Sequence, residues 1–377
     1  MKINLNYLFI FFTYILITVL SSPINLNDIK NLVNTKLFVK NDYNSILDFI
    51  DDIKKALNNG AVDVIKLEEI FNNLFNITVI DPIENLIEST ERKKFSVKKN
   101  GFYGELFEPE NNNYPGKALI LCTGSDGDFN MVRTLSKGLS NNGITVLGLG
   151  YFKVPGTPSA LKQVPLEYIE KAGNYLKSEG FEKIGMWGFS AGSVYSLLGG
   201  VYFPDLISLV VASSPSNFVF QCYGTPTFVN KSAFSYKGKQ IPYEPNANRF
   251  DVLKTIYLMI RDLEPNTLYL FDNLEKTASE NHLIPVEKMK ARVLFFSGKL
   301  DKCWPSESSS QMMMKRLQSK NYTYPYEHIS CEYGGHVMAP FRTSMDVMMR
   351  ANRDYPEEAN EYREQHLNKL LEVFNEW

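Results

Sequence analysis

The stretch KIGMWGFSAGSVYSLL, residues 183–198, decides the fold. A short apolar run enters a Gly-x-Ser-x-Gly turn and continues into a segment of small and apolar residues. In a nucleophile elbow a serine sits on the tight turn between a strand and a helix, and its neighbours two positions away must be tiny. Gly188 and Gly192 meet that demand. Ser190 is therefore a candidate nucleophile, the alternative being a small residue at a strand-to-helix turn.

The segments around this turn alternate between two patterns. Apolar strand-like runs and amphipathic helical stretches follow one another, which predicts βαβ units. We therefore expect an α/β class protein with a mostly parallel, doubly wound sheet, helices on both faces and reacting residues at the carboxyl ends of the strands. The predicted strands besides 183–189 are 117–124, 144–152, 207–215 and 292–301, and the predicted helices are 129–139, 165–180, a helix from Ala191 and 249–263.

A serine nucleophile needs a general base, and the base needs an orienting acid. In hydrolases built on such a sheet the chain order is serine, acid, histidine. Asp301 ends the run RVLFFSGKLD and is the predicted acid, although an Asp at a strand end is also a common turn residue. His336 follows CEYGG and is the predicted base.

The other three histidines fit the role of base less well. His282 precedes the predicted acid, and His328 lies inside a strand-like run, where a packed or surface imidazole is expected. His366 belongs to the charged C-terminal stretch EYREQHLNKLLEVF, and we expect it on the solvated face of a helix. The base is therefore assigned to the glycine loop.

An oxyanion hole requires two N–H donors directed at the developing charge. One is expected from Ala191, directly after the nucleophile. The other is expected from the loop TGSDGDFN, with Ser125 the first choice and Gly124 the second. In the same loop Asp128 is predicted to cap the next helix, and Asp126 to face water.

The chain begins with features of a signal peptide. One Lys precedes an apolar run over residues 7–20, which is followed by Ser21 and Ser22. A membrane-spanning helix needs about 20 apolar residues, so cleavage near Ser21 is favoured over an anchor. We expect residues 1–21 to be removed, no stable membrane anchor afterwards, and a secreted or lumenal protein of the secretory pathway.

Two further regions follow from the pattern of apolar residues. Residues 22–92 are predicted to be a helical N-terminal segment, and residues 93–377 the catalytic domain. Within that domain, residues 216–290 are too long for a plain connection. We expect this insertion to form a lid or pocket wall over the active site, the alternative being a surface excursion.

Net charge, cysteine spacing and sequons indicate which partners and modifications to expect. The formal net charge is −2 and no Lys/Arg run marks a nucleic-acid surface, so nucleic-acid binding is not expected. Cysteine spacing resembles no zinc pattern, and neither a metal nor a cofactor is predicted. In an oxidising compartment Cys303 and Cys331 are candidates for a disulfide. Glycosylation is predicted at the sequons of Asn76, Asn230 and Asn321.

Several longer stretches resemble one known family, the catalytic domain shared by acyl-CoA thioesterases and bile acid-CoA:amino acid N-acyltransferase. The resemblance implies the dienelactone-hydrolase-like α/β-hydrolase fold, a small-molecule acyl thioester or ester substrate, and a triad of Ser190, Asp301 and His336. It covers roughly residues 95–350 and rests on the stretches YFKVPGTPSALKQVPLEYIEKAGNYLKS (151–178), IGMWGFSAGS (184–193), SPSNFVFQ (214–221), IPVEKMKARVLFFSGKLDKCWPS (284–306) and GGH (334–336).

The nucleophile distinguishes the branches of that family. The acyltransferase branch uses cysteine where this chain has Ser190, so the resemblance points to hydrolysis through an acyl-enzyme. A predicted leader would place the enzyme where acyl-CoA is scarce, which keeps two alternatives open: an esterase acting on oxygen esters and an acyl-CoA:amino acid N-acyltransferase. A third, of another class, is a non-catalytic hydrolase-like binding protein.

Overall fold

The computed structural model describes residues 92–222, 230–245, 251–262, 264–271, 274, 278–343 and 345–377. The predicted signal peptide, nearly all of the predicted helical segment 22–92 and the sequon at Asn76 lie outside these residues. Among the helices that are described, none is both long and apolar enough to cross a membrane.

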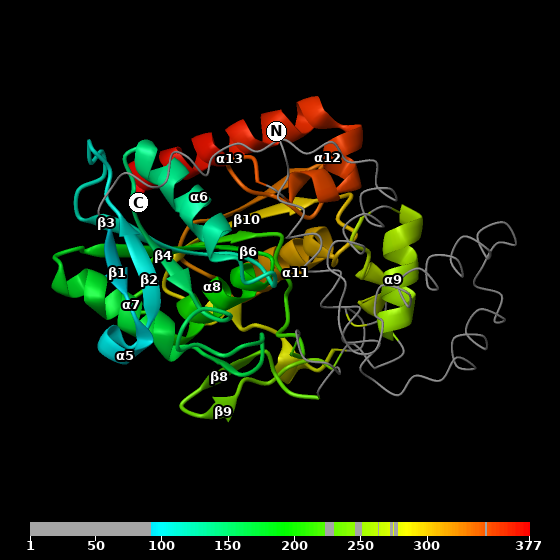
Figure 1. Ribbon diagram of the computed structural model, residues 1–377, viewed down its shortest axis with the longest axis horizontal. Helices are drawn as coiled ribbons and strands as arrows, with labels where there is room; N and C mark the ends of the chain where they lie inside the picture. Colours follow the sequence, from blue (N-terminus) through cyan, green and yellow to red (C-terminus); the bar gives the residue numbers. More distant parts are fainter. Residues whose placement is uncertain are drawn as a thin grey trace, which may run out of the picture.

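An eight-stranded sheet in the order β1-β2-β4-β3-β6-β7-β10-β11 forms the centre of the protein (Figure 1). From β4 to β11 in this order, adjacent strands run parallel to one another, whereas β2 is antiparallel to both β1 and β4. This is the α/β-hydrolase fold, as predicted. Its strands are β1 (Lys93–Phe95), β2 (Tyr103–Phe107), β3 (Lys117–Cys122), β4 (Thr145–Gly150), β6 (Lys183–Phe189), β7 (Leu209–Ser213), β10 (Arg292–Gly298) and β11 (Tyr326–Cys331).

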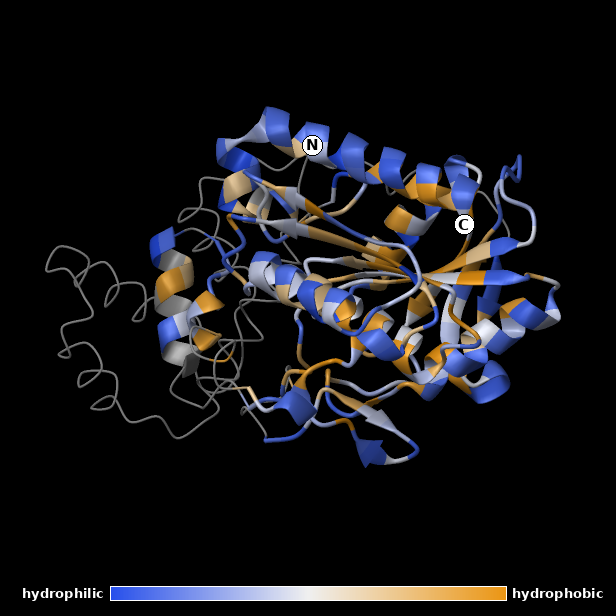
Figure 2. Ribbon diagram, turned by 180° about the vertical axis from the view of Figure 1, so that it is seen from behind, coloured by the Kyte–Doolittle hydropathy of each residue, from blue (hydrophilic) through white to orange (hydrophobic). Residues whose placement is uncertain are grey.

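Helices cover both faces of the sheet, and each face has its own apolar core. Helices α6 (Phe129–Asn141) and α13 (Pro356–Glu376) pack on one face. Helices α7 (Glu167–Ser178), α8 (Ala191–Tyr202) and α11 (Ser306–Ser319) pack on the other. Figure 2 shows apolar strands enclosed between helices that carry polar residues outward. The short helices are α5 (Val97–Asn100) and α12 (Arg350–Asp354).

The described parts of residues 216–290 pack against the apolar core on the face of the sheet that carries α8. Strands β8 (Phe234–Tyr236) and β9 (Lys239–Gln240) join β5 (Val164–Pro165) in a small second sheet, and helix α9 spans Asp251–Asp262. Phe220 and Phe271 of this region pack on Trp304, with ring centroids 5.5 and 6.1 Å away. The insertion thus contacts the loop after β10, and its action as a lid stays a prediction.

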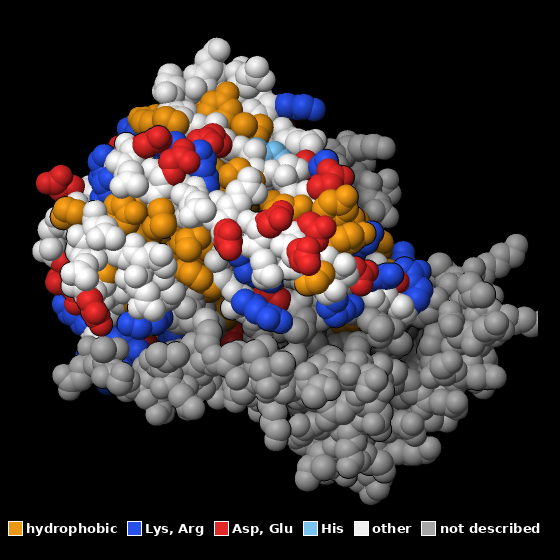
Figure 3. All heavy atoms as spheres, turned by 90° about the horizontal axis from the view of Figure 1, so that it is seen from above, with side chains coloured by type: hydrophobic (Ala, Val, Ile, Leu, Met, Phe, Trp, Pro, Cys, Tyr) orange, Lys and Arg blue, Asp and Glu red, His pale blue; other side chains and the backbone are white. Residues whose placement is uncertain are grey.

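Charged side chains of both signs alternate on the face that carries α13. Figure 3, the view from above, shows Lys and Arg interspersed with Asp and Glu on this face. Several are paired: Arg292 contacts Glu327 and Glu376 at 3.2 and 2.8 Å, and Lys369 contacts Glu327 at 2.7 Å. These pairs link α13 to the edge of the sheet.

His366 lies in the core and not on the solvated helix face, so that expectation was wrong. It is 1 % exposed, and its Nε2 accepts a hydrogen bond of 3.0 Å from the indole Nε1 of Trp187. The ring of Phe296 stacks on it with centroids 3.6 Å apart. Burial lowers the pKa of His366 from 6.5 to about 3. This imidazole joins α13 to the sheet in its neutral form.

The pH dependence of the free energy of unfolding should reflect the neutral form of the His366 imidazole. Because the folded-state pKa of His366 lies below the unfolded value, stability is full above pH 6.5 and falls as the pH drops toward 3. His366→Gln keeps an acceptor for Trp187 without this titration. From pH 7 to pH 5, the free energy of unfolding measured by chemical denaturation should fall by about 1 to 2 kcal/mol less in the variant than in the wild type. Equal losses in both proteins would contradict the assignment.

Candidate active site

Ser190 occupies a strained turn between β6 and α8. Its backbone has φ 54° and ψ −122°, an unusual conformation for a residue with a side chain. A Cβ at Gly188 would overlap the carbonyl oxygen of Gly192, and one at Gly192 would overlap the carbonyl oxygen of Thr123. Strand, helix and the turn after β3 therefore meet backbone to backbone. This is the nucleophile elbow that the sequence predicts.

The structure brings together the three residues predicted as a triad. The Nε2 atom of His336 lies 2.8 Å from Ser190 Oγ, and its Nδ1 atom lies 2.9 Å from Asp301 Oδ2. All three residues are at least 94 % buried. With the carboxylate accepting from Nδ1–H, Nε2 is left to accept the serine proton. The arrangement is suited to activating a hydroxyl for attack on a carbonyl.

The carboxylate of Asp301 is held by donors on both oxygens. Oδ1 accepts the backbone N–H groups of Cys303 and Trp304, at 2.8 and 3.2 Å. Oδ2 accepts the hydroxyl of Ser306 at 2.6 Å, besides the imidazole of His336. These bonds fix the plane of the carboxylate toward the imidazole.

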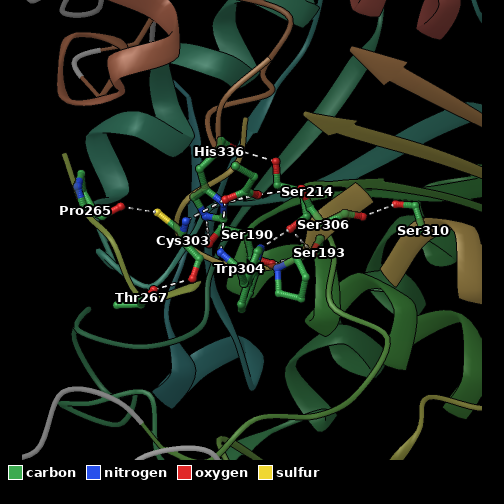
Figure 4. Close-up of polar contacts among 12 residues, drawn as sticks. Ser190, Ser193, Ser214, Pro265, Thr267, Cys303, Trp304, Ser306, Ser310 and His336 are labelled. Atoms are coloured by element: carbon green, nitrogen blue, oxygen red, sulfur yellow. Dashed lines mark hydrogen bonds and ion pairs between the residues drawn. The ribbon is translucent and has the colours of Figure 1, made fainter. Parts of the chain in front are cut away.

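Ser214 forms hydrogen bonds with both the loop that carries His336 and the loop that carries Asp301 (Figure 4). Its hydroxyl donates to the carbonyl oxygen of His336 at 2.5 Å, and its own carbonyl accepts from Trp304 Nε1 at 2.8 Å. The Trp304 ring meets the His336 ring edge-on, with centroids 5.4 Å apart. Ser214 itself has φ 48°, a strained value for serine. The ends of β7, β10 and β11 are thus linked behind the imidazole.

Sequence reasoning did not find Ser214, Trp304 or Ser306. One signal was present: SPS (214–216) directly follows the strand β7, and the carboxyl ends of parallel strands are where a site forms. Trp304 and Ser306 lie within five residues of the predicted acid. Position in the sequence, however, does not predict with which loop each side chain forms a hydrogen bond.

The turn after β3 lies against the nucleophile, as an oxyanion hole requires. A Cβ at Gly124 would sit 3.1 Å from Ser190 Cβ, whereas Ser125 is exposed. The hydroxyl of Tyr151 donates to the carbonyls of Thr123 and Gly124, at 2.7 and 3.2 Å, and so fixes the turn. Ala191 starts α8 directly after the nucleophile. Donation by Ser125 and Ala191 stays a prediction.

Asp128 caps α6 as expected, but Asp126 does not simply face water. Asp128 accepts from the N–H of Asn130 at 2.9 Å, and Asp126 Oδ2 accepts from the N–H of Asp128 at 2.9 Å. The other oxygen of Asp126 is buried and has no hydrogen-bond partner in the described part of the chain. Burial raises the pKa of Asp126, and burial together with this neighbour raises the pKa of Asp128 to about 6.

The predicted disulfide is not formed, because all four cysteines are free thiols. Cys303 directs its Sγ to the carbonyl of Pro265 at 3.5 Å, and Cys331 is buried below Gly334. The two cysteines follow the acid and precede the base, but neither thiol is bonded to the other. Of the sequons, Asn230 and Asn321 are exposed, and their glycosylation stays a prediction.

The two other histidines are bound outside the triad. His282 Nδ1 lies 2.6 Å from Glu244 Oε2, and His328 Nε2 lies 2.7 Å from Ser297 Oγ. His328 is thus packed at the sheet edge, which is one of the two placements expected for it.

Replacing Ser306 should lower the activity of the candidate enzyme. Ser306→Ala removes a donor from Asp301 Oδ2, so the carboxylate is held less firmly toward the His336 imidazole. The value of kcat/KM should then fall roughly fivefold, which corresponds to the ~1 kcal/mol of one hydrogen bond. The control is Ser310→Ala, since the Ser310 hydroxyl donates to the Ser306 carbonyl and not to the carboxylate. Equal kcat/KM for all three proteins would refute this role.

Residues 164–345 match the family described as "BAAT / Acyl-CoA thioester hydrolase C terminal". Mouse acyl-coenzyme A amino acid N-acyltransferase 2 is 28 % identical over 231 residues, which are 60 % of this chain and 50 % of that protein. Human acyl-coenzyme A thioesterase 1 is 28 % identical over 243 residues, 63 % of this chain and 52 % of that protein. The chain spans about half the length of these curated relatives.

Solved structures resemble the chain only distantly. A putative dienelactone hydrolase from Klebsiella pneumoniae aligns with a TM-score of 0.47 and 14 % identity, covering 76 % of this chain and 99 % of its own. The assignment of the fold therefore rests on the strand order and the turn at Ser190. The match over residues 164–345 confirms the resemblance that the sequence predicts.

Proposed function

We propose that the protein is a serine hydrolase of small-molecule acyl thioesters, with acyl-CoA the first candidate class. The observation that carries the proposal is the unbroken line of contacts from Ser190 Oγ through the His336 imidazole to Asp301, at 2.8 and 2.9 Å. The names of the matched family and relatives support the substrate class. Neither a metal nor a cofactor is required by the steps below.

Acylation begins with the attack of Ser190 Oγ on the acyl carbon. His336 Nε2 takes the hydroxyl proton as the bond forms, and Asp301 stabilises the resulting imidazolium. The negative charge on the carbonyl oxygen is to be met by backbone N–H groups of Ala191 and of the turn at Gly124–Ser125. The thiolate then leaves with the proton from the imidazolium, and an acyl ester remains on Ser190.

Deacylation repeats these steps with water as the nucleophile. Water loses a proton to His336 and attacks the ester, and the acid is released when Ser190 regains its proton. A serine ester is readily hydrolysed, whereas a cysteine thioester favours transfer to an amine. The hydroxyl of Ser190 is thus the reason to place hydrolysis ahead of the N-acyltransferase and esterase alternatives.

We also propose that residues 1–21 direct the protein into the secretory pathway. The support is the order of one Lys, an apolar run too short for a membrane span, and two serines. In that compartment thioesters other than acyl-CoA, or oxygen esters, become candidate substrates.

Removal of the nucleophile is the most direct test of the proposed reaction. Ser190→Ala should lower kcat/KM for acyl-CoA at least about 1,000-fold, since the residual rate comes only from binding and the oxyanion hole. Thermal unfolding of the variant should stay cooperative. Turnover near the wild-type rate would rule out the mechanism.

A panel of substrates, assayed with the wild type and Ser190→Ala, distinguishes a thioesterase from an esterase and from an N-acyltransferase. A thioesterase releases free acid and CoA from acyl-CoA faster than it cleaves aryl esters of the same chain. An N-acyltransferase instead gives amide product when glycine or taurine is added. Aryl-ester turnover without acyl-CoA turnover would favour the esterase. Failure of a fluorophosphonate to label Ser190 would revive the non-catalytic alternative.

Terminal sequencing of the protein made in a eukaryotic secretory host tests the proposed location. The mature chain should begin within a few residues of Ser22 and should appear in the lumenal or secreted fraction. An intact Met1 or blocked first residue on protein found outside the secretory fractions would contradict it.

A further inference from the structure

Three side chains beside the nucleophile offer nitrogen, oxygen and sulfur ligands. One ligand atom from each of Asp301, Cys303 and His336 lies within 4.8 Å of the other two, and in the described part of the chain this is the one group of its kind. The carboxylate Oδ2 and imidazole Nδ1 are already 2.9 Å apart. The loops after β10 and β11 therefore bring a mixed set of ligands to one point.

The set suits a thiophilic divalent cation. In a tetrahedral zinc site, bonds of 2.0 to 2.3 Å place neighbouring ligand atoms roughly 3.5 Å apart. The three ligand atoms lie within 4.8 Å of one another, so this spacing needs a closure of about 1 Å at most, which a rotation of the Cys303 side chain can supply. A carboxylate and a thiolate balance the two charges of the cation, and the imidazole binds neutral.

The Cys303 thiol can change its partner, and a bound cation would keep one position open. Asp301 and His336 are buried, whereas Cys303 is partly exposed as a residue. Its Sγ donates only a weak hydrogen bond of 3.5 Å to the Pro265 carbonyl, which cation binding would replace (Figure 4). Three protein ligands leave the fourth position of a tetrahedral ion to water.

We propose that Asp301, Cys303 and His336 form an inhibitory site for a thiophilic divalent cation such as Zn²⁺. The ion binds His336 Nδ1 and Asp301 Oδ2, the two atoms whose hydrogen bond orients the imidazole. The Nδ1 proton moves by exchange with water to Nε2, and the Cys303 thiol releases its proton to solvent. With a proton on Nε2, the imidazole cannot accept the proton of Ser190. The inhibition rests on the proposed function, whereas the binding does not.

Calorimetric titration of the metal-free full-length protein with Zn²⁺ tests the binding by itself. Wild type and Ser190→Ala should each bind one ion at this site with release of one proton, and Mg²⁺ should not compete because it prefers oxygen ligands. Cys303→Ala and Cys303→Ser should weaken this binding at least tenfold. Both keep the backbone N–H that Asp301 Oδ1 accepts. Cys331→Ala, which removes a thiol outside the trio, should bind like the wild type.

Labelling of Ser190 by a fluorophosphonate then tests the inhibition. Zn²⁺ should slow labelling of the wild type and of Cys331→Ala, and a chelator should restore it, while both Cys303 variants resist the ion. Equal Zn²⁺ affinity in the wild type and both Cys303 variants, with cooperative unfolding in all, would overturn the site. A lack of acyl-CoA turnover with intact Cys303-dependent Zn²⁺ binding would refute only the proposed function.

Discussion

The backbone contact between β6, α8 and the turn after β3 is the constraint on which the site depends. Gly188 and Gly192 leave no room for a side chain between these elements, and the turn that joins them holds Ser190 at φ 54°. Such a conformation costs on the order of 1–3 kcal/mol, which the cores on both faces of the sheet offset. The result is a hydroxyl fixed at the carboxyl edge of the sheet, where the other loops can reach it.

The loops that meet this hydroxyl are held by one another as well as by the sheet. Ser214 bonds the base loop through its hydroxyl and the acid loop through its carbonyl. Asp301 in turn receives donors from the backbone and from Ser306. Side chains fixed in this way need little reorganisation when charge moves to the imidazole. The same close packing puts Cys303 within reach of the triad.

Much of the fold and the triad could be predicted from the sequence, because each depends on local pattern or chain order. Apolar runs marked the parallel strands, and the order serine, acid, histidine selected Asp301 and His336. Contacts between distant loops leave no such pattern, so the roles of Ser214 and Trp304 appear only in the structure. His366 was misplaced because its charged neighbours hide the apolar stripe of α13. The expected nearness of the loops after β10 and β11 likewise suggested a disulfide, whereas Cys303 and Cys331 are both free thiols.

The central claim is that Ser190 carries the acyl group between substrate and water. Rapid acid quenching of the enzyme with acyl-CoA, followed by peptide mass spectrometry, tests it directly. The account predicts that the peptide containing Ser190 gains the mass of the acyl group, and that Ser190→Ala shows no such adduct. An acyl adduct on another residue, or turnover in which the Ser190 peptide never carries the group, would contradict it.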